Sequence, residues 1–78
     1  MTALLIVEDN ATFANTVVQF LSRFGDTTVA ALVSTAEDAL EQLPRLTVDL
    51  VLVDVSLPTM SGIELVSAIH QSYPHLRC

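Results

Sequence analysis

Apolar residues concentrate in three short runs along the chain, and polar segments separate these runs. The runs are Ala3–Val7, Thr28–Val33 and Leu50–Val53. In the first and third runs apolar side chains occupy consecutive positions, which is typical of parallel strands buried on both faces rather than of half-exposed antiparallel strands. The second run is rich in β-branched residues. The pattern therefore predicts three strands.

The segments between these runs have helical periodicity. A first helix is predicted over about residues 11–24, and Gly25 stands where a C-terminal helix cap is expected. A second helix is predicted to begin with the capping-box pair Ser34 and Glu37 and to end at about Pro44. The apolar residues that fall on one face of the first helix are Phe13, Val17, Phe20, Leu21 and Phe24.

A third helix is predicted over Gly62–Ser72, with Ser61 as its N-cap and Pro74 closing it. Its apolar residues at helical spacing are Ile63, Val66 and Ile69. The last four residues, His75–Cys78, resemble the opening of a fourth strand. The chain has no internal repeat, linker or low-complexity segment, so we expect one domain.

Alternation of strand and helix predicts an α/β fold with a parallel sheet and right-handed crossovers. The first and third strands both end in acidic residues, so we place them side by side with the second strand outside the first. The resulting order, 2-1-3, is that of flavodoxin-like three-layer folds. It creates a crevice at the carboxyl ends of the first and third strands, where such folds bind ligands.

Three carboxylates are expected to meet in this crevice. Glu8 and Asp9 follow the first strand, and Asp54 follows the third. Such crowding is unfavourable unless a cation is bound or a carboxylate is protonated. Mg²⁺ prefers oxygen ligands, so Asp9 and Asp54 are candidate direct ligands, with Glu8 acting directly or through water and a backbone carbonyl after Asp54 completing the set. A metal there would keep Asp54 ionised and neutralise charge on a transferred phosphoryl group.

Composition excludes several classes of protein. The net charge is −6, from nine acidic residues against three arginines, and there is no lysine, so the chain alone is not expected to bind nucleic acid. Hydrophobic residues make up 51% of the 78 residues, but no run approaches the length of a membrane span. No basic region precedes the first apolar run, so a signal peptide is not expected and the cytoplasm is the default location. The single cysteine, Cys78, cannot form an internal disulfide.

Three motifs resemble the receiver domain of two-component response regulators. They are Val7-Glu8-Asp9-Asn10, Asp49-Leu50-Val51-Leu52-Val53-Asp54 and Leu57-Pro58-Thr59-Met60-Ser61-Gly62, and the match runs through the whole chain in order and spacing. The resemblance implies that Asp54 accepts a phosphoryl group from a histidine kinase. It implies metal ligands at Asp9, Glu8 and the backbone carbonyl of Ser56, and a loop shaped by Pro58 and Gly62.

The chain also departs from this family. The family has five strand–helix units, and this sequence supplies three, so we expect residues 1–78 to be a partial receiver domain without strands four and five. The phosphate-binding lysine has no counterpart in a chain without lysine. Phosphorylation is therefore expected to be impaired, and transcription control would reside in an output domain outside this chain. Self-association is predicted through the open edge of the third strand, because the stub His75–Cys78 is too short to cover much of it.

Two other functions are compatible with parts of the pattern. A haloacid-dehalogenase-type phosphohydrolase also places a nucleophilic Asp after an apolar strand, but it requires a second Asp two residues later, where this chain has Ser56, and a lysine. A flavodoxin-like ligand-binding module requires a phosphate-binding loop rich in glycine or hydroxyl residues after the first strand. Here that position holds Glu8, Asp9 and Asn10.

Overall fold

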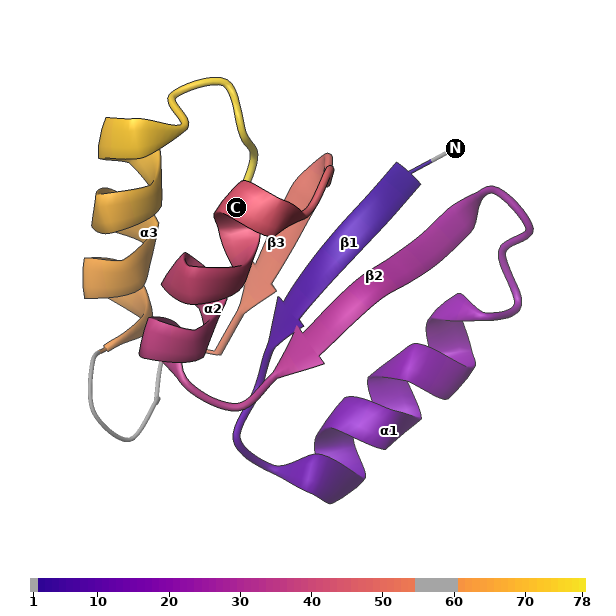
Figure 1. The fold of residues 1–78 in the computed structure, drawn as a ribbon. Coiled ribbons are helices and arrows are strands. Elements are labelled where there is room, and N and C mark those ends of the chain that lie inside the picture. Colours follow the sequence, from indigo (N-terminus) through magenta and orange to yellow (C-terminus); the bar gives the residue numbers. More distant parts are fainter. Residues whose placement is uncertain (1, 55–60) are drawn as a thin grey trace.

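A computed structural model describes residues 2–54 and 61–78. The elements in chain order are β1 (Thr2–Val7), α1 (Ala11–Leu21), β2 (Thr27–Val33), α2 (Ala36–Gln42), the 3₁₀ turn η1 (Leu43–Arg45), β3 (Leu50–Val53) and α3 (Gly62–Ser72) (Figure 1). The strands form one parallel sheet in the order β2-β1-β3, which confirms the predicted fold class and strand order. In the described ranges, no helix is long and apolar enough to cross a membrane.

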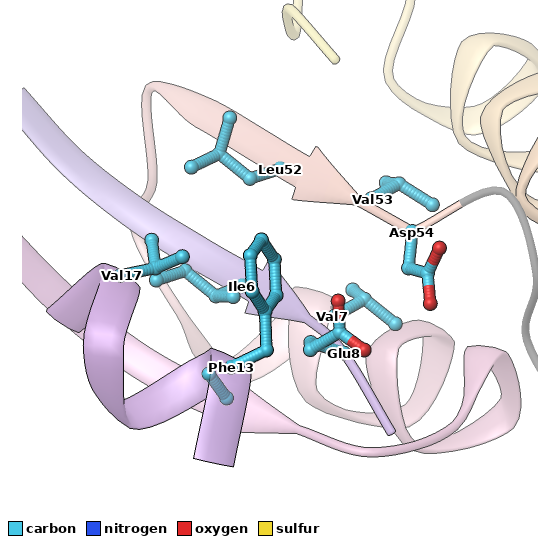
Figure 2. Close-up of a pocket in the computed structure, with 9 residues that line it drawn as sticks. Ile6, Val7, Glu8, Phe13, Val17, Leu52, Val53 and Asp54 are labelled. Carbon is cyan, nitrogen blue, oxygen red and sulfur yellow. The ribbon is translucent and has the colours of Figure 1, made fainter. Parts of the chain in front are cut away.

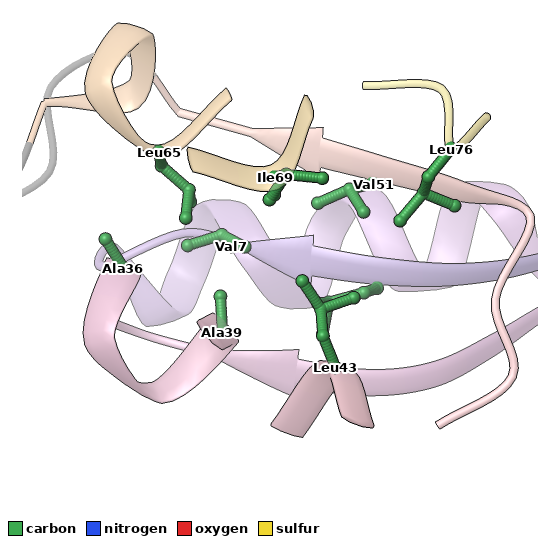
Figure 3. Packing of buried hydrophobic residues seen from close by; sticks show 9 residues of the cluster. Val7, Ala36, Ala39, Leu43, Val51, Leu65, Ile69 and Leu76 are labelled. Atoms are coloured by element: carbon green, nitrogen blue, oxygen red, sulfur yellow. The ribbon is translucent and has the colours of Figure 1, made fainter. Parts of the chain in front are cut away.

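The two faces of the sheet are covered unequally. Helices α2 and α3 lie on one face, whereas α1 alone lies on the other (Figure 1). The main core fills the space between the sheet and the α2–α3 pair (Figure 3). Its fully or almost fully buried members are Leu5, Val7, Ala36, Ala39, Leu43, Val51, Leu65, Ile69 and Leu76. The face with two helices is therefore closed, and the face with one helix is not.

Helix α1 begins as predicted but ends earlier. The Asn10 side chain accepts a hydrogen bond from the Phe13 N–H at 3.0 Å, which caps the first turn. The helix ends at Leu21, and the Ser22 N–H and hydroxyl satisfy carbonyls of its last turn. The C-cap is Ser22, so the prediction that Gly25 caps this helix is wrong, and no described glycine has a positive φ.

The apolar face predicted for α1 is only partly buried. Ala14 packs fully against the sheet and Val17 is half-buried. The phenylalanines remain in contact with solvent, with exposures of 57% for Phe13, 56% for Phe20 and 48% for Phe24. One helix cannot bury so wide an apolar face against one side of the sheet.

Helix α2 starts one residue later than predicted. Thr35, not Ser34, is the N-cap, and its hydroxyl accepts a hydrogen bond from the Asp38 N–H at 3.1 Å. Both residues are good cap formers, so the sequence pattern alone could not separate them. The helix ends at Gln42, close to the predicted end, and Pro44 lies in the 3₁₀ turn η1 that follows it.

Alanine substitutions at the two candidate N-cap residues are expected to change the free energy of unfolding by different amounts. Thr35→Ala should lower the free energy of unfolding by about 1 kcal/mol, because the Asp38 N–H loses its acceptor. Ser34→Ala is the matched control and should change stability by less than about 0.5 kcal/mol, as is usual for a surface substitution. Urea denaturation of both variants measures the difference, and equal losses would show that the cap is wrongly placed.

Helix α3 has the predicted bounds and the predicted cap. The Ser61 hydroxyl accepts a hydrogen bond from the Glu64 N–H at 3.1 Å. Its buried face, however, consists of Gly62, Leu65 and Ile69, and Ile63 is 74% exposed. Gly62 is the first residue of α3 and does not have a positive φ, and its role in shaping the loop stays a prediction.

The C-terminal stub pairs with the edge of β3. The Val51 N–H donates to the Arg77 carbonyl at 2.9 Å, and Leu50 and Arg77 form a parallel bridge. Leu76 is 6% exposed and belongs to the main core. The resemblance of His75–Cys78 to the start of a strand is thus reflected in the structure. The first half of the β3 edge is less open than the sequence suggested.

Candidate functional site

Strand register brings the acidic residues to one edge of the sheet. Val7 of β1 is the partner of Val53 of β3, so the next residues, Glu8 and Asp54, leave the sheet side by side. Backbone hydrogen bonds fix both of these residues to the neighbouring strand. The Glu8 N–H donates to the Val33 carbonyl at 2.9 Å, and the Asp54 N–H donates to the Val7 carbonyl at 3.0 Å. The hydrogen-bonded backbone of the sheet therefore sets the positions from which these side chains extend.

The three carboxylates converge as the sequence predicted. Glu8, Asp9 and Asp54 each offer one oxygen atom, and these three atoms lie within 4.8 Å of one another. Glu8 and Asp54 are partly buried and Asp9 is exposed. Figure 2 shows the Glu8 and Asp54 carboxylates facing each other beyond the ends of β1 and β3. This cluster is accessible to solvent, so a hydrated cation can reach it.

The cluster perturbs the titration of Glu8. The hydrogen bond that Glu8 accepts from the Asn10 N–H, at 3.0 Å, lowers its pKa. Desolvation, the negative charge of Asp54, and hydrogen bonds with Asp9 and Asp54 act in the opposite direction and together raise the pKa of Glu8 above its ordinary value. An ionised Glu8 is therefore destabilised by its neighbours, as crowded acids are expected to be.

This shift predicts a pH dependence in the absence of divalent cations. Because the pKa of Glu8 is raised on folding, its contribution favours the folded state at low pH and is lost as the pH rises from about 4.5 through the raised value. Glu8→Gln should therefore reduce the loss of stability between pH 4 and 7, by less than about 1 kcal/mol, since Glu8 is largely solvated. Urea denaturation of the wild type and of the variant across this pH range measures the difference. Identical pH profiles of the free energy of unfolding in the two proteins would contradict the raised pKa of Glu8.

The donor set fits a hard divalent cation such as Mg²⁺. Two oxygens bound to one Mg²⁺ at about 2.1 Å lie at most about 4.2 Å apart. The separations within 4.8 Å in this cluster need only small side-chain rotations to reach that geometry. Mg²⁺ usually takes one or two carboxylates and keeps several waters, so two acids can ligate directly while the third acts through water.

Among the described residues, neither Asp49 nor Arg23 nor Arg45 joins the acidic cluster. Ser56 and Pro58 lie outside the described residues. Arg23 follows the C-terminal end of α1 and Arg45 lies in η1, so both are at the end of the sheet opposite the acids. The Asp49 carboxylate accepts a hydrogen bond from the Ala3 N–H at 2.8 Å and joins the starts of β3 and β1.

One feature of the site was not predicted. An apolar groove of about 440 Å³ lies between α1 and β3, and it reaches the carboxylates of Glu8 and Asp54 (Figure 2). Its remaining lining residues are Ile6, Val7, Phe13, Ala14, Val17, Leu52 and Val53. The available signal was the set of phenylalanines on one face of the predicted first helix, Phe13, Phe20 and Phe24.

A three-stranded parallel sheet with an acidic cluster at the carboxyl ends of β1 and β3 is the arrangement that the resemblance to receiver domains implies. The chain matches the response regulator receiver domain family over residues 4–78. It therefore belongs to that family, which confirms the resemblance and decides against the phosphohydrolase and ligand-binding alternatives. The chain is a signalling domain of two-component systems.

Proteins that are similar in sequence to this chain have been given different names. The chain is 31% identical over 74 residues to a protein-glutamate methylesterase/protein-glutamine glutaminase of Bacillus licheniformis, covering 95% of this chain and 21% of that protein. It is 39% identical over 66 residues to the Regulator of RpoS of Escherichia coli, covering 85% of this chain and 19% of that protein. The chain thus spans about a fifth of the length of these curated relatives.

Solved structures show the same fold. RcsB from Salmonella enterica serovar Typhimurium, bound to promoter rprA with the phosphomimetic BeF₃⁻, matches with a TM-score of 0.91 and 20% identity over 97% of this chain and 64% of that chain. The isolated REC domain of RcsB also matches with a TM-score of 0.91 and 20% identity, over 96% of this chain and 56% of that domain. These likenesses support the fold assignment.

Proposed function

We propose that Asp54 is the phosphoacceptor and that Glu8, Asp9 and Asp54 hold Mg²⁺ beside it. The observation that carries this proposal is the convergence of three carboxylate oxygens within 4.8 Å at the carboxyl edge of the sheet. Bound Mg²⁺ would supply the positive charge that offsets the charge of an incoming phosphoryl group. Asp54 supplies the attacking oxygen, while Asp9 and Glu8 supply oxygen ligands. The Ser56 carbonyl is proposed as a further ligand.

The phosphoryl donor is proposed to be a phosphohistidine of a histidine kinase, the general partner of receiver domains. We further propose that residues 1–78 are part of a receiver domain, since the chain covers 56% of the similar isolated REC domain.

The chain itself is not proposed to be an enzyme. Transcription control through an output domain is proposed for the whole protein. A catalytic output is the alternative, because one relative is named a methylesterase.

Phosphorylation of this chain alone is expected to be inefficient. Positioning and charge neutralisation contribute most of the catalysis in phosphoryl transfer. The chain has no lysine, and its three arginines lie away from Asp54: Arg23 and Arg45 are at the opposite end of the sheet, and Arg77 bridges Leu50 at the start of β3. No cation of this chain is therefore placed to hold the phosphoryl oxygens in the part that the structure describes.

A small phosphodonor with Mg²⁺, followed by mass spectrometry with peptide mapping, tests the proposal. We expect a substoichiometric mass increase that maps to Asp54, requires Mg²⁺ and is absent in Asp54→Asn. Asp49→Asn is the matched control at the other end of β3 and should label like the wild type. Label on another residue would contradict the role of Asp54. Stoichiometric label at Asp54 would contradict only the expected impairment.

A further inference from the structure

Asn10 connects the acidic cluster to helix α1 through hydrogen bonds on both of its sides. Its backbone N–H donates to Oε2 of Glu8 at 3.0 Å. Its side-chain Oδ1 accepts a hydrogen bond from the Phe13 N–H at 3.0 Å and so caps the helix. Its carbonyl oxygen accepts a further hydrogen bond from the Ala14 N–H at 2.9 Å. A single residue therefore contacts a candidate metal ligand and the first turn of α1.

The helix sets the direction in which the Asn10 N–H points. Ala14 is 1% exposed and packs against the sheet, so the first turn of α1 has a fixed place. Asn10 has an extended backbone, with φ of −88° and ψ of 106°, which is the ordinary conformation of an N-cap residue. Because its side chain and its carbonyl are both bonded to the helix, the N–H group of Asn10 is held toward Glu8.

This hydrogen bond restrains the Glu8 carboxylate and leaves its second oxygen for a cation. Oε2 of Glu8 receives the Asn10 N–H, and Figure 2 shows the carboxylate facing that of Asp54. Glu8 is only partly buried, and a long, flexible side chain of this kind loses rotamer freedom when it binds an ion. A partner that orients a ligand in advance reduces this cost and increases affinity for the metal.

We propose that Asn10 is a positioning residue for the cation site and couples occupation of this site to the first turn of α1. This role depends on the proposed function, because it requires a cation to bind at Glu8, Asp9 and Asp54. Coupling between two sites is reciprocal in free energy. Since the capped helix orients Glu8 and thereby favours the cation, a bound cation in turn stabilises the capped turn of α1.

The affinity of the folded chain for Mn²⁺ measures the role of Asn10. Asn10→Ala should raise the Kd by about tenfold, the lower end of the effect of removing a partner of a metal ligand. Asn10→Ser restores an N-cap oxygen and should restore the wild-type Kd. Thr35→Ala is the matched control, because it removes the N-cap of α2 and should leave the Kd unchanged.

Electron paramagnetic resonance of free Mn²⁺ gives these Kd values without any phosphoryl transfer, and circular dichroism verifies that each variant folds. Asn10→Gly also lacks the side-chain oxygen but costs less stability at an N-cap than alanine. It should raise the Kd as Asn10→Ala does, and it takes the place of that variant if alanine prevents folding. A purely structural role for Asn10 would lower stability and leave the Kd of the folded chain unchanged.

The N–H of Asn10 can be removed without changing the cap. In a synthetic chain, an ester in place of the amide between Asp9 and Asn10 removes the donor to Glu8 and keeps the Asn10 side chain, so Phe13 stays capped. We expect the Kd for Mn²⁺ to rise by about tenfold here too. An unchanged or lower Kd in the ester chain would show that the hydrogen bond does not orient Glu8, which overturns the proposal.

Hydrogen exchange tests the coupling to α1. By reciprocity, saturating Mg²⁺ should slow exchange of the Phe13 and Ala14 amides by about tenfold, the factor expected for the Kd. The Asp38 and Ala39 amides make the equivalent hydrogen bonds to the N-cap of α2 and should slow less. In the ester chain the difference between the two helices should disappear.

Failure of the wild-type chain to bind Mn²⁺ would overturn the proposed function and this role of Asn10 together. Binding with the same Kd in Asn10→Ala and Thr35→Ala would overturn only the role of Asn10 and leave the cation site in place. Equal slowing of hydrogen exchange at the first turns of α1 and α2 in the wild type would overturn the coupling in the same way.

Discussion

Replacing Asp54 by alanine is expected to remove most of the thermal stabilisation that Mg²⁺ gives the wild-type chain. A ligand that binds only the folded state stabilises it by RT ln(1 + [L]/Kd), which is about 1.4 kcal/mol at ten times the Kd. For a chain of this size that corresponds to an increase in Tm of roughly 5–10 °C. The variant loses one of three converging carboxylates, so the shift should fall close to zero.

Thermal unfolding with and without Mg²⁺ measures this effect, at constant ionic strength so that general screening does not contribute. Asp49→Asn is the control because Asp49 lies at the opposite end of β3 and asparagine retains an oxygen acceptor for the Ala3 N–H. This control should keep the full Mg²⁺ shift. An equal Mg²⁺ shift in Asp54→Ala and in the wild type would mean that the stabilising ion binds elsewhere.

Leu65→Ala is expected to bring the chain close to global instability. Leu65 is 0% exposed and belongs to the main core between α3 and the sheet. Truncation of a buried leucine typically costs 2–5 kcal/mol, because apolar contacts are lost and a cavity remains, so we expect about 3 kcal/mol. A chain of 78 residues has a total stability of only about 4–12 kcal/mol.

Ile63→Ala provides a control on the same helix. Ile63 is 74% exposed, so this truncation should change the free energy of unfolding by less than about 0.5 kcal/mol. Urea denaturation of both variants gives the comparison. Similar losses in the two variants would show that the buried face of α3 is not the one described, and would favour the apolar spacing predicted from the sequence.

The sheet and the acidic cluster could be predicted because local signals determine them. Consecutive apolar residues define β1 and β3, and the acids follow these strands directly in the sequence. Once β1 and β3 are adjacent, the register that pairs Val7 with Val53 brings Glu8 and Asp54 together. The roles of these residues in metal binding and phosphoryl transfer stay predictions.

The details that were not predicted depend on tertiary packing. Ser34 and Thr35 are chemically similar caps, so the local sequence could not tell that Thr35 is the N-cap of α2. The exposure of Phe13 and Phe20 depends on how much of the sheet one helix covers, which periodicity cannot show. Pairing of Arg77 with Val51 is a contact between residues far apart in sequence, and it carries no strong local pattern.

The ends of β1 and β3 are proposed to form one site for a divalent cation beside Asp54. Titration of ¹⁵N-labelled chain with small amounts of Mn²⁺, which broadens the amide signals nearest to it, shows where the ion binds. We predict that the amides of Glu8, Asp9 and Asp54 broaden first and recover when excess Mg²⁺ is added. Broadening that begins at the acidic residues of α2, Glu37, Asp38 and Glu41, or that Mg²⁺ does not reverse, would contradict the claim.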